Sequence, residues 1–467
     1  MAERLSPLDT VFLQIEDGSA AHMHVGSVMV FKGDAPSRDE FARRIEANLH
    51  EVPRYRQVVR SAPGEVARPS WVDDPDFDLD YHVRAVDLPG DGGMDELRGF
   101  AGDLFGRRLD RTRPLWENWV VGNCEEDCWA LVSKTHHCMI DGIGGVEMIS
   151  KLFSLESDEG PPPEPEPWEP ADAPSLTEVI TGAVSERFEV PADLARAVAG
   201  GLTDPIGLAK EAAGIAAGLG EMAGEVISGA GNNPYSREIG PNRRFGWVPG
   251  SLVGVKRVKD ELDATVNDVV LASVAGALRK HLARRGHDLE GVEVTVQVPV
   301  SIRGDDGEDQ GNQVTNVLCE LPVSTADPLE RLRAICEEME ELKSGGQAVG
   351  AEALISSLGL APPNMLALAV RGLVGGGLFD LTVTNVPGPQ VPLYMGTDQL
   401  QQFYPLVPLF KGCGLGIAIL SYDGGLYYGL VVDPQIVDDL DDLCECMRES
   451  LGELAEIAGL EREATLA

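Results

Sequence analysis

The sequence has 467 residues, 43% of them hydrophobic, and its 76 acidic residues outnumber 38 basic ones, which gives a formal net charge of −38. A chain of this length exceeds one ordinary core, so we expect at least two domains. The excess of negative charge repels phosphates, which excludes nucleic acid as a partner and argues against simple electrostatic docking on anionic lipid.

The cysteines and the first residues indicate the compartment. Eight cysteines are scattered along the chain, and none has the paired C-x-x-C spacing of a zinc site. The start, Met1-Ala2-Glu3-Arg4, lacks the basic region and apolar core of a signal peptide. No uncharged apolar run reaches the roughly 18 residues of a membrane span. We therefore expect a cytoplasmic chain with reduced thiols.

The first part of the chain mixes strands and helices. Hydrophobic periodicity predicts strands over 24–31 and 129–135, and helices over 38–49 and 143–155. Residues 160–174 are rich in Pro and Glu, which is typical of a solvated linker. An Ala- and Gly-rich segment over 176–228 follows and predicts loosely specified helices.

The mixed pattern resumes at about residue 244. It predicts a helix over 265–283 and strands over 292–299, 380–386 and 414–422. We therefore predict an α+β protein with an N-terminal domain over 1–158, a linker and helical connector over 159–243, and a C-terminal domain over 244–467.

The run His136-His137-Cys138-Met139-Ile140-Asp141-Gly142 carries the most compact set of chemically usable groups in the sequence. It follows the strand over 129–135, and Gly142 allows the close backbone approach that a strand-to-helix turn needs. Imidazole has an ordinary pKa of about 6.5, so it can take a proton from an attacking hydroxyl and return it to a leaving group. Adjacent strand residues point to opposite faces, so the two histidines cannot serve equally. We predict His137 as the base, with Asp141 fixing the turn through an arginine such as Arg303.

The histidine run has two other interpretations. A hydrogen-bonded core histidine is the commonest alternative for any single histidine, and a metal site is another. The metal interpretation lacks a clear third ligand, since Cys138 is the only soft donor nearby, so we predict no metal. Residues 412–416 begin with G-x-G but lead into a strand, which is wrong for a dinucleotide site. No G-x-S-x-G nucleophile elbow or P-loop is present. By spacing alone, Asn267-Asp268 predicts a helix cap.

At these residues the chain resembles the bacterial wax ester synthase/acyl-CoA:diacylglycerol acyltransferase family, and the resemblance runs nearly end to end. The histidine run matches the family's HHxxxDG motif in full. The other matching segments are Leu5-Ser6-Pro7-Leu8-Asp9, Met23-His24-Val25-Gly26, the PLW segment over 110–117, Val266-Asn267-Asp268, Pro299-Val300-Ser301-Ile302-Arg303, Gly311-Asn312-Gln313, Thr384-Asn385-Val386-Pro387-Gly388-Pro389 and Ser421-Tyr422-Asp423-Gly424. Residues 160–229 carry no such motif.

The resemblance implies an α+β fold of two chloramphenicol-acetyltransferase-like domains that form a central substrate tunnel. It implies that His137 is the base, that His136 and Gly142 support the site, and that Asp141 is structural. It also raises Asn267 from a cap to a residue near the reacting centre. The residues that it suggests for substrate binding are Asn385, Gly388, Arg303 and Trp116, of which Gly388 shapes the tunnel wall and Trp116 also supports the core.

The resemblance therefore predicts an acyl-CoA-dependent O-acyltransferase. A long-chain acyl group would pass from CoA to a lipid alcohol, either diacylglycerol or a fatty alcohol, by direct attack. No cofactor is expected, because acyl-CoA is a substrate. The insoluble product predicts a peripheral membrane or lipid-droplet location, with residues 206–227 and 365–378 as candidate surface helices.

Two alternatives stay open at this point. One is another HxxxD acyltransferase with a different acceptor, such as a condensation domain that uses carrier-bound thioesters. The other is a non-catalytic protein that binds lipid or coats droplets. The sequence does not identify the acceptor.

Overall fold

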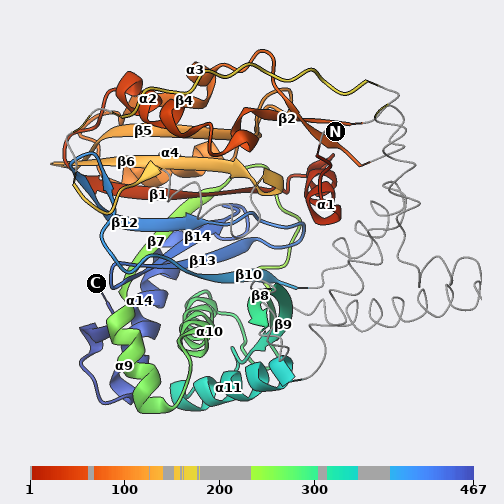
Figure 1. Ribbon diagram of the computed structural model, residues 1–467. Coiled ribbons are helices and arrows are strands. Elements are labelled where there is room, and N and C mark those ends of the chain that lie inside the picture. The colour runs from red at the N-terminus through yellow and green to blue at the C-terminus, as the bar shows by residue number, and fades with distance from the viewer. Residues whose placement is uncertain are drawn as a thin grey trace, which may run out of the picture.

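The computed structural model describes residues 3–61, 68–125, 127–139, 152–157, 160, 162–175, 178, 233–302, 313–344 and 379–466. Two six-stranded sheets dominate these residues. In Figure 1 the first sheet lies above the second, and a layer of helices covers the lower face of the second sheet. The fold is therefore layered, with the two sheets in the middle.

The first sheet combines strands from both ends of the chain. Its strand order is β11 (Tyr394–Met395), β12 (Asp398–Leu406), β1 (His24–Lys32), β6 (Cys128–His136), β5 (Trp116–Glu125) and β4 (Val83–Asp87). β1 runs antiparallel to β6, with His24 opposite His136, and antiparallel to β12, with Gly26 opposite Leu406. A separate hairpin pairs β2 (Gln57–Arg60) with β3 (Ser70–Asp73).

Four helices and a 3-10 turn accompany the first sheet. They are α1 (Pro7–Glu16), α2 (Arg38–Asn48), η1 (Pro53–Arg56), α3 (Leu79–His82) and α4 (Met94–Phe105). In α2 the residues Phe41, Ala42 and Ile45 are buried. Their spacing of one, three and four residues forms the apolar stripe of an amphipathic helix.

The second sheet is mixed. Its strand order is β7 (Arg244–Ser251), β14 (Gly425–Val432), β13 (Leu415–Tyr422), β10 (Leu381–Pro387), β8 (Val294–Ile302) and β9 (Gln313–Leu321). β10 runs parallel to both β13 and β8, whereas the other pairs are antiparallel. Every residue of β13 is buried, which fits a central strand that is covered on both faces.

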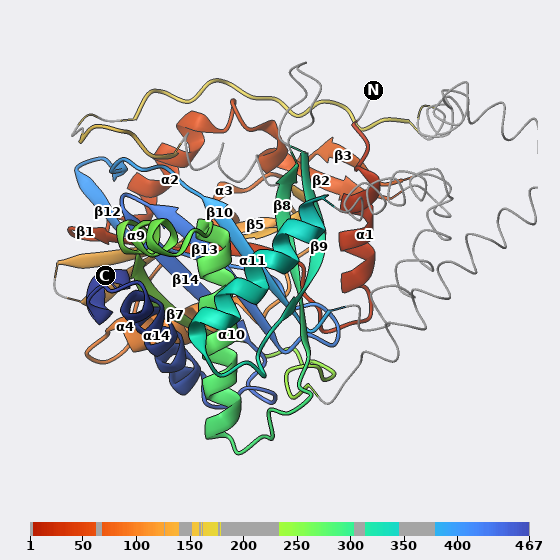
Figure 2. The same ribbon diagram turned by 90° about the horizontal axis from the view of Figure 1, so that it is seen from below.

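Helices cover the face of the second sheet that is turned away from the first (Figures 1 and 2). They are α9 (Leu252–Leu262), α10 (Val266–Arg284), α11 (Pro328–Ser344) and α14 (Leu440–Ile457), followed by the short η4 (Arg462–Thr465). α10 starts at a capping box, in which the Thr265 side chain accepts the N–H of Asp268 and the Asp268 side chain accepts the N–H of Thr265. α10 is apolar nearly all round, because it packs between its neighbours and the sheet.

The two sheets meet along β12 and β14. A Cβ on Gly429 would lie 1.9 Å from the carbonyl oxygen of Pro405, so only glycine permits this approach. Beside it, the rings of Trp247 and Tyr404 stack with centroids 4.9 Å apart. The apolar side chains of both sheets therefore form one continuous core.

Most predicted elements are confirmed within three residues of their ends. These are the strands over 24–31, 129–135, 292–299, 380–386 and 414–422, and the helices over 38–49 and 265–283. The predicted helix over 143–155 lies largely outside the described residues. Its predicted end is wrong, because Ser154 forms a bridge with Tyr394 instead of continuing a helix.

The division into domains has one complication. β12 belongs to the predicted C-terminal domain but pairs with β1 of the N-terminal one. The boundaries at 158 and 243 stay predictions. Residues 206–227 and 365–378 lie outside the described residues, and no helix in the described part is long and apolar enough to span a membrane.

Candidate active site

Helix α1 presents two side chains to the histidine run. Ser6 caps the helix, since its Oγ accepts the N–H of Asp9 at 3.0 Å, and Pro7 at the first helical position fits that start. Phe12 and Glu16 are four residues apart, so they share one face of the helix. Both lie beside the end of β6, where His136 and His137 follow one another.

His136 is fully buried and its protonation is set by its contacts. Its Nδ1 accepts the backbone N–H of Cys138 at 3.1 Å, so the proton of the neutral ring is assigned to Nε2. Nε2 lies 3.6 Å from a carboxylate oxygen of Glu16. Burial lowers the pKa of His136, although Glu16 acts in the opposite sense, so the ring is neutral at pH 7. His136 therefore anchors the turn that carries His137.

Glu16 is the centre of a buried polar cluster beneath that turn. It is 2% exposed, and Arg111 donates to the same carboxylate oxygen from Nε at 3.0 Å and from Nη2 at 2.6 Å. Its other oxygen lies 3.5 Å from Nε2 of His24. Burial alone would raise the pKa of Glu16, but His136 and Arg111 outweigh it and lower the pKa to about 2. Glu16 is therefore an ionised carboxylate inside the protein.

His137 has different surroundings from its neighbour. It opens the 3-10 turn η3 (His137–Met139), and its backbone N–H donates to the carbonyl of Met23 at 2.7 Å. Its ring stacks on Phe12 with centroids 4.3 Å apart. The residue is half-buried, whereas His136 is wholly enclosed. His137 is therefore less enclosed than His136.

The strand beside the histidines is closely packed. A Cβ on Gly26 would lie 2.0 Å from the carbonyl oxygen of Ser133, so no larger residue fits there. Opposite Gly26, the fully buried Lys134 donates from Nζ to the carbonyl of Leu104 at 2.9 Å, near the end of α4. Burial lowers the pKa of Lys134 to about 8. These contacts fix β1 and β6, and with them the position of η3.

Comparison with known proteins identifies the family. Residues 5–270 match the model of the wax ester synthase/diacylglycerol acyltransferase catalytic domain, and residues 310–455 match the model of the WS/DGAT C-terminal domain. The chain belongs to the wax ester synthase/diacylglycerol acyltransferase family. It is therefore an O-acyltransferase, as the resemblance predicted.

Curated relatives agree over the whole length. The probable diacylglycerol O-acyltransferase tgs1 of Mycobacterium tuberculosis is 32% identical over 469 residues, which cover 97% of this chain and 96% of that protein. The probable diacylglycerol O-acyltransferase tgs2 of the same species is 33% identical over 475 residues, covering 98% and 99%.

Solved structures confirm the predicted two-domain acyltransferase fold. The wax ester synthase/diacylglycerol acyltransferase from Marinobacter aquaeolei VT8 aligns with a TM-score of 0.69 at 24% identity, covering 98% of this chain and 100% of that one. The first condensation domain of the CDA synthetase aligns with a TM-score of 0.56 at 17% identity, covering 100% and 99%.

Several of the predicted site residues either lie away from the histidines or fall outside the described residues. Asp141, Gly142 and Arg303 lie outside the described residues. Asn267 is half-buried in the first turn of α10, where Thr265 and not Asn267 is the cap. α10 lies on the far face of the second sheet (Figure 1), and no hydrogen bond among the described residues joins Asn267 to His137. Its place near the reacting centre stays a prediction.

The predicted substrate-binding residues differ in their surroundings. Asn385 is half-buried near the end of β10. Gly388 follows that strand, and a Cβ there would lie 2.3 Å from the carbonyl oxygen of Ser421. Trp116 is 1% exposed, and its indole N–H donates to the carbonyl of Tyr55 at 2.8 Å. Trp116 therefore supports the core and offers no surface to a substrate, so the packing gives no support to the binding role predicted for it.

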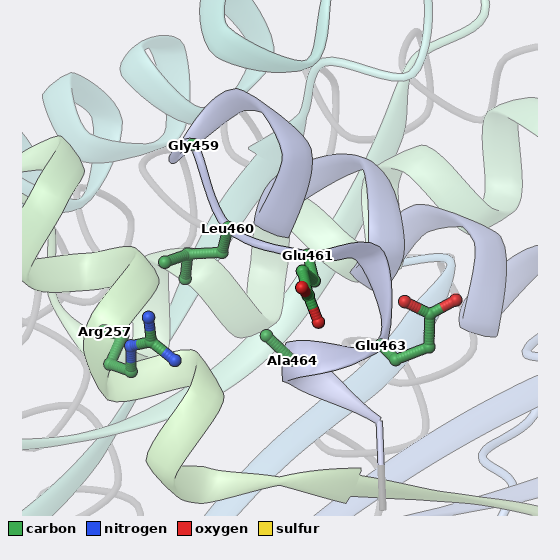
Figure 3. Close-up of a pocket in the computed structure, with 6 residues that line it drawn as sticks. All are labelled: Arg257, Gly459, Leu460, Glu461, Glu463 and Ala464. Carbon is green, nitrogen blue, oxygen red and sulfur yellow. The ribbon is translucent and has the colours of Figure 1, made fainter.

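One pocket lies far along the chain from the histidine site. It has a volume of about 540 Å³ and lies between α9 and the C-terminal segment, where Arg257, Leu460, Glu461 and Glu463 line it (Figure 3). The charged side chains of its lining do not suit a long acyl chain. Among the described residues that line this pocket there is neither His136 nor His137.

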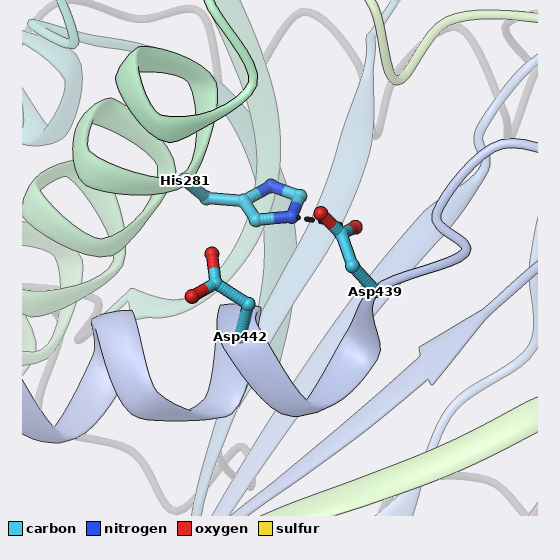
Figure 4. A group of neighbouring side chains, drawn as sticks. All are labelled: His281, Asp439 and Asp442. Carbon is cyan, nitrogen blue, oxygen red and sulfur yellow. Dashed lines mark hydrogen bonds and ion pairs between the residues drawn. The ribbon is translucent and has the colours of Figure 1, made fainter.

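A second group of titratable side chains joins α10 to α14 (Figure 4). Nε2 of His281 contacts Oδ1 of Asp439 at 2.9 Å, and Nδ1 contacts the hydroxyl of Tyr235 at 2.7 Å. Asp442 accepts a hydrogen bond from Arg284 at 2.6 Å. Both ring nitrogens are thus engaged and Asp442 is paired with a cation, which explains the group as a structural link between the two helices.

Neither Glu16 nor Arg111 was predicted as a site residue from the sequence. Glu16 ends an apolar helix and is followed by Asp17, so it resembles an exposed terminal charge. The available signal was its spacing of four residues from the buried Phe12, which puts it on the same face.

Proposed function

We propose that the protein transfers a long-chain acyl group from acyl-CoA to a lipid alcohol, with His137 as the general base. The observation that carries the proposal is the fixed turn η3, in which buried His136 holds the N–H of Cys138 and leaves His137 half-exposed. The names of the M. tuberculosis relatives favour diacylglycerol as the acceptor. The family's name includes wax ester synthesis, which makes a fatty alcohol the second acceptor to test.

The proposed reaction proceeds in one active-site complex. His137 takes the proton of the alcohol as its oxygen attacks the thioester carbonyl, which produces a tetrahedral oxyanion. That intermediate collapses, the C–S bond breaks, and the CoA thiolate receives the proton from the imidazolium. The products are an ester and CoA. The proposal requires neither an acyl-enzyme nor a cofactor.

His136 is a positioning residue in this scheme. Its Nδ1 already accepts a backbone N–H, and its Nε2 is directed at Glu16, so it has no free lone pair for a substrate. Asn267 and the buried Glu16 complete the proposal, the first by orienting the acyl group and the second by holding His136. We further propose peripheral association with a membrane or lipid droplet, because the product ester is insoluble in water.

Thiol release tests the proposed function directly. Purified protein is incubated with palmitoyl-CoA and either dipalmitoylglycerol or hexadecanol, and free CoA is followed over time. We expect release that depends on the acceptor and disappears in His137→Ala. The exposed His50 lies on the surface after α2, and His50→Ala is the matched control that keeps full activity.

The other outcomes identify the alternatives. Folded protein that releases no thiol with any acceptor supports a non-catalytic lipid-binding role. Activity that requires a carrier-bound thioester supports a condensation-type enzyme. Full activity of His137→Ala would end the mechanistic proposal.

A further inference from the structure

The second sheet splits between β8 and β10. β10 stays in register with β13 from Thr382, opposite Gly416, to its end. With β8 it pairs only at Leu381 and Thr382, opposite Val296 and Gln297. β8 itself remains paired with β9 up to Ile302. Beyond Gln297 and Thr382, the facing edges of these two described strands therefore lack each other as hydrogen-bond partners.

The split begins at a fixed point. Just before it, Asp380 holds β8 and β10 together. The N–H of Thr295 donates to Oδ2 of Asp380 at 2.8 Å, and the N–H of Asp380 donates to the carbonyl of Thr295 at 2.8 Å. The hydroxyl of Ser236 donates to the other carboxylate oxygen. The separation that follows is thus a built feature of the sheet and not a frayed end.

One buried oxygen on each of two side chains at the base of the split has no hydrogen-bond partner within the described residues. Thr382 is 7% exposed, and its Oγ1 has no hydrogen bond within the described residues. The same holds for the buried Oε1 of Gln297. The two residues are register partners, so their side chains stand on the same face of the sheet. Buried polar atoms are rarely left without a partner, so this pair suits a ligand or ordered water.

That face is directed at the end of the first sheet that carries the histidines. Gly416, the other register partner of Thr382, faces Val407, since a Cβ on Gly416 would lie 3.0 Å from Val407 Cγ2. Val407 directly follows Leu406, which pairs with Gly26 of β1. Gly26 is two residues along β1 from His24, the register partner of His136.

We propose that Thr382 and Gln297 bind the amide-bearing arm of the acyl-CoA substrate where it enters the split between β8 and β10. This inference rests on the proposed function. Between its thioester and its nucleotide, CoA carries two secondary amides, whereas the lipid acceptors carry only hydroxyl and ester groups. An extended amide chain matches the free edges of two strands and the carboxamide and hydroxyl at their base.

Isosteric substitutions test the site. Thr382→Val and Gln297→Met remove the polar atoms and keep the volume, and Thr382→Ser restores the hydroxyl. Loss of one hydrogen bond predicts an increase of about fivefold to tenfold in KM for palmitoyl-CoA, with the KM for the acceptor unchanged. Thr382→Ser should retain the original KM. S-palmitoyl-mercaptoethanol, a donor without amides, should show the same kcat/KM with the variants as with the original protein.

A matched control separates this site from a general packing effect. Thr465 is also fully buried with an unpartnered hydroxyl, but it lies in η4 near the C-terminus. Thr465→Val should change neither KM. If palmitoyl-CoA KM does not rise in Thr382→Val, or if the acceptor KM rises instead, the inference is overturned and the two atoms hold only water. An equal loss with the amide-free donor would also overturn it.

Binding of free CoA, measured by calorimetry, distinguishes this inference from the proposed function. If the original protein binds CoA and folded Thr382→Val binds it about fivefold to tenfold more weakly, the site stands even where no acyl transfer is detected. If acyl transfer is normal and CoA binding is the same in both proteins, the proposed function stands and the inference fails.

Discussion

Replacing Glu16 by glutamine tests whether the buried carboxylate holds the catalytic turn. Glu16 accepts from Arg111 and faces the Nε2 proton of His136. Arg111 and Nε2 of His136 approach the same oxygen of Glu16. A glutamine of the same shape is neutral, so even with its amide oxygen turned to that position it loses the charge of the acceptor. Loss of one charge-assisted hydrogen bond costs about 1.5–3 kcal/mol in stability.

The effect on catalysis follows from the link to His137. His136 restrains the N–H of Cys138, the next residue after His137, so a displaced His136 displaces the base. A misplaced catalytic group costs on the order of 10²-fold in rate, which corresponds to about 2.7 kcal/mol in activation free energy. We expect Glu16→Gln to lower kcat by this order with little change in KM for either substrate.

The assay is thiol release from palmitoyl-CoA at saturating acceptor, with thermal unfolding measured in parallel. Asp17→Asn is the matched control, because Asp17 pairs with the same Arg111 at 2.7 Å but its side chain is 55% exposed. That exposed pair should contribute only about 0–1 kcal/mol to stability and nothing to kcat. Equal kcat values for Glu16→Gln and Asp17→Asn would refute the positioning role.

Three further predictions concern packing, pH and the thiol. Gly26→Ala should lower the melting temperature and the activity together, because its Cβ would lie 2.0 Å from Ser133 O, and overpacking costs about 1–3 kcal/mol; an unchanged melting curve would contradict the tight β1–β6 packing. Burial lowers the pKa of His82 to about 4 from its ordinary 6.5, so between these two values the unfolded chain binds more protons than the folded one. The free energy of unfolding should therefore fall by up to about 1.4 kcal/mol per pH unit as the pH drops from 6.5 towards 4. His82→Asn, which can still donate to Trp116 O, should flatten that slope in urea unfolding at pH 7 and 5, and an identical slope would argue against it. Cys138 is buried, and burial raises the pKa of its thiol, so the thiol is a poor nucleophile. Cys138→Ala should therefore keep the rate of thiol release within a few-fold of the original protein's rate, and an inactive variant would point to an acyl-thiol intermediate.

Local patterns predicted the elements that are built from local interactions. The helix over 265–283 was evident because its apolar residues recur at helical spacing and Thr265 with Asp268 marks its start. The strand over 24–31 and the strand before the histidines were equally evident from alternation and from their boundaries. The sequence also placed His136 and His137 at the end of a strand, and the structure assigns them different surroundings.

Long-range contacts had no such signal. The pairing of His136 with Glu16 and Arg111 joins three segments that are far apart in the sequence, and only their fold brings them together. The residues of β12 do not alternate regularly between buried and exposed positions, so nothing in them shows that this strand joins the first sheet. Trp116 has a predicted core role as well as a predicted substrate contact, and the ring of His82 and the carbonyl of Tyr55 that enclose it fit the core role.

The position of β12 has a consequence for how the protein is made. β1 is synthesised near the start of the chain, but its partner strand begins at Asp398. At roughly 5–20 residues per second, the ribosome needs tens of seconds to supply that partner. During this time β1 presents an open edge to solvent, and an unpaired edge strand is a template for aggregation. We expect the N-terminal half to precipitate when it is expressed alone. Expression of residues 244–467 as a separate chain in the same cells should keep that half in solution.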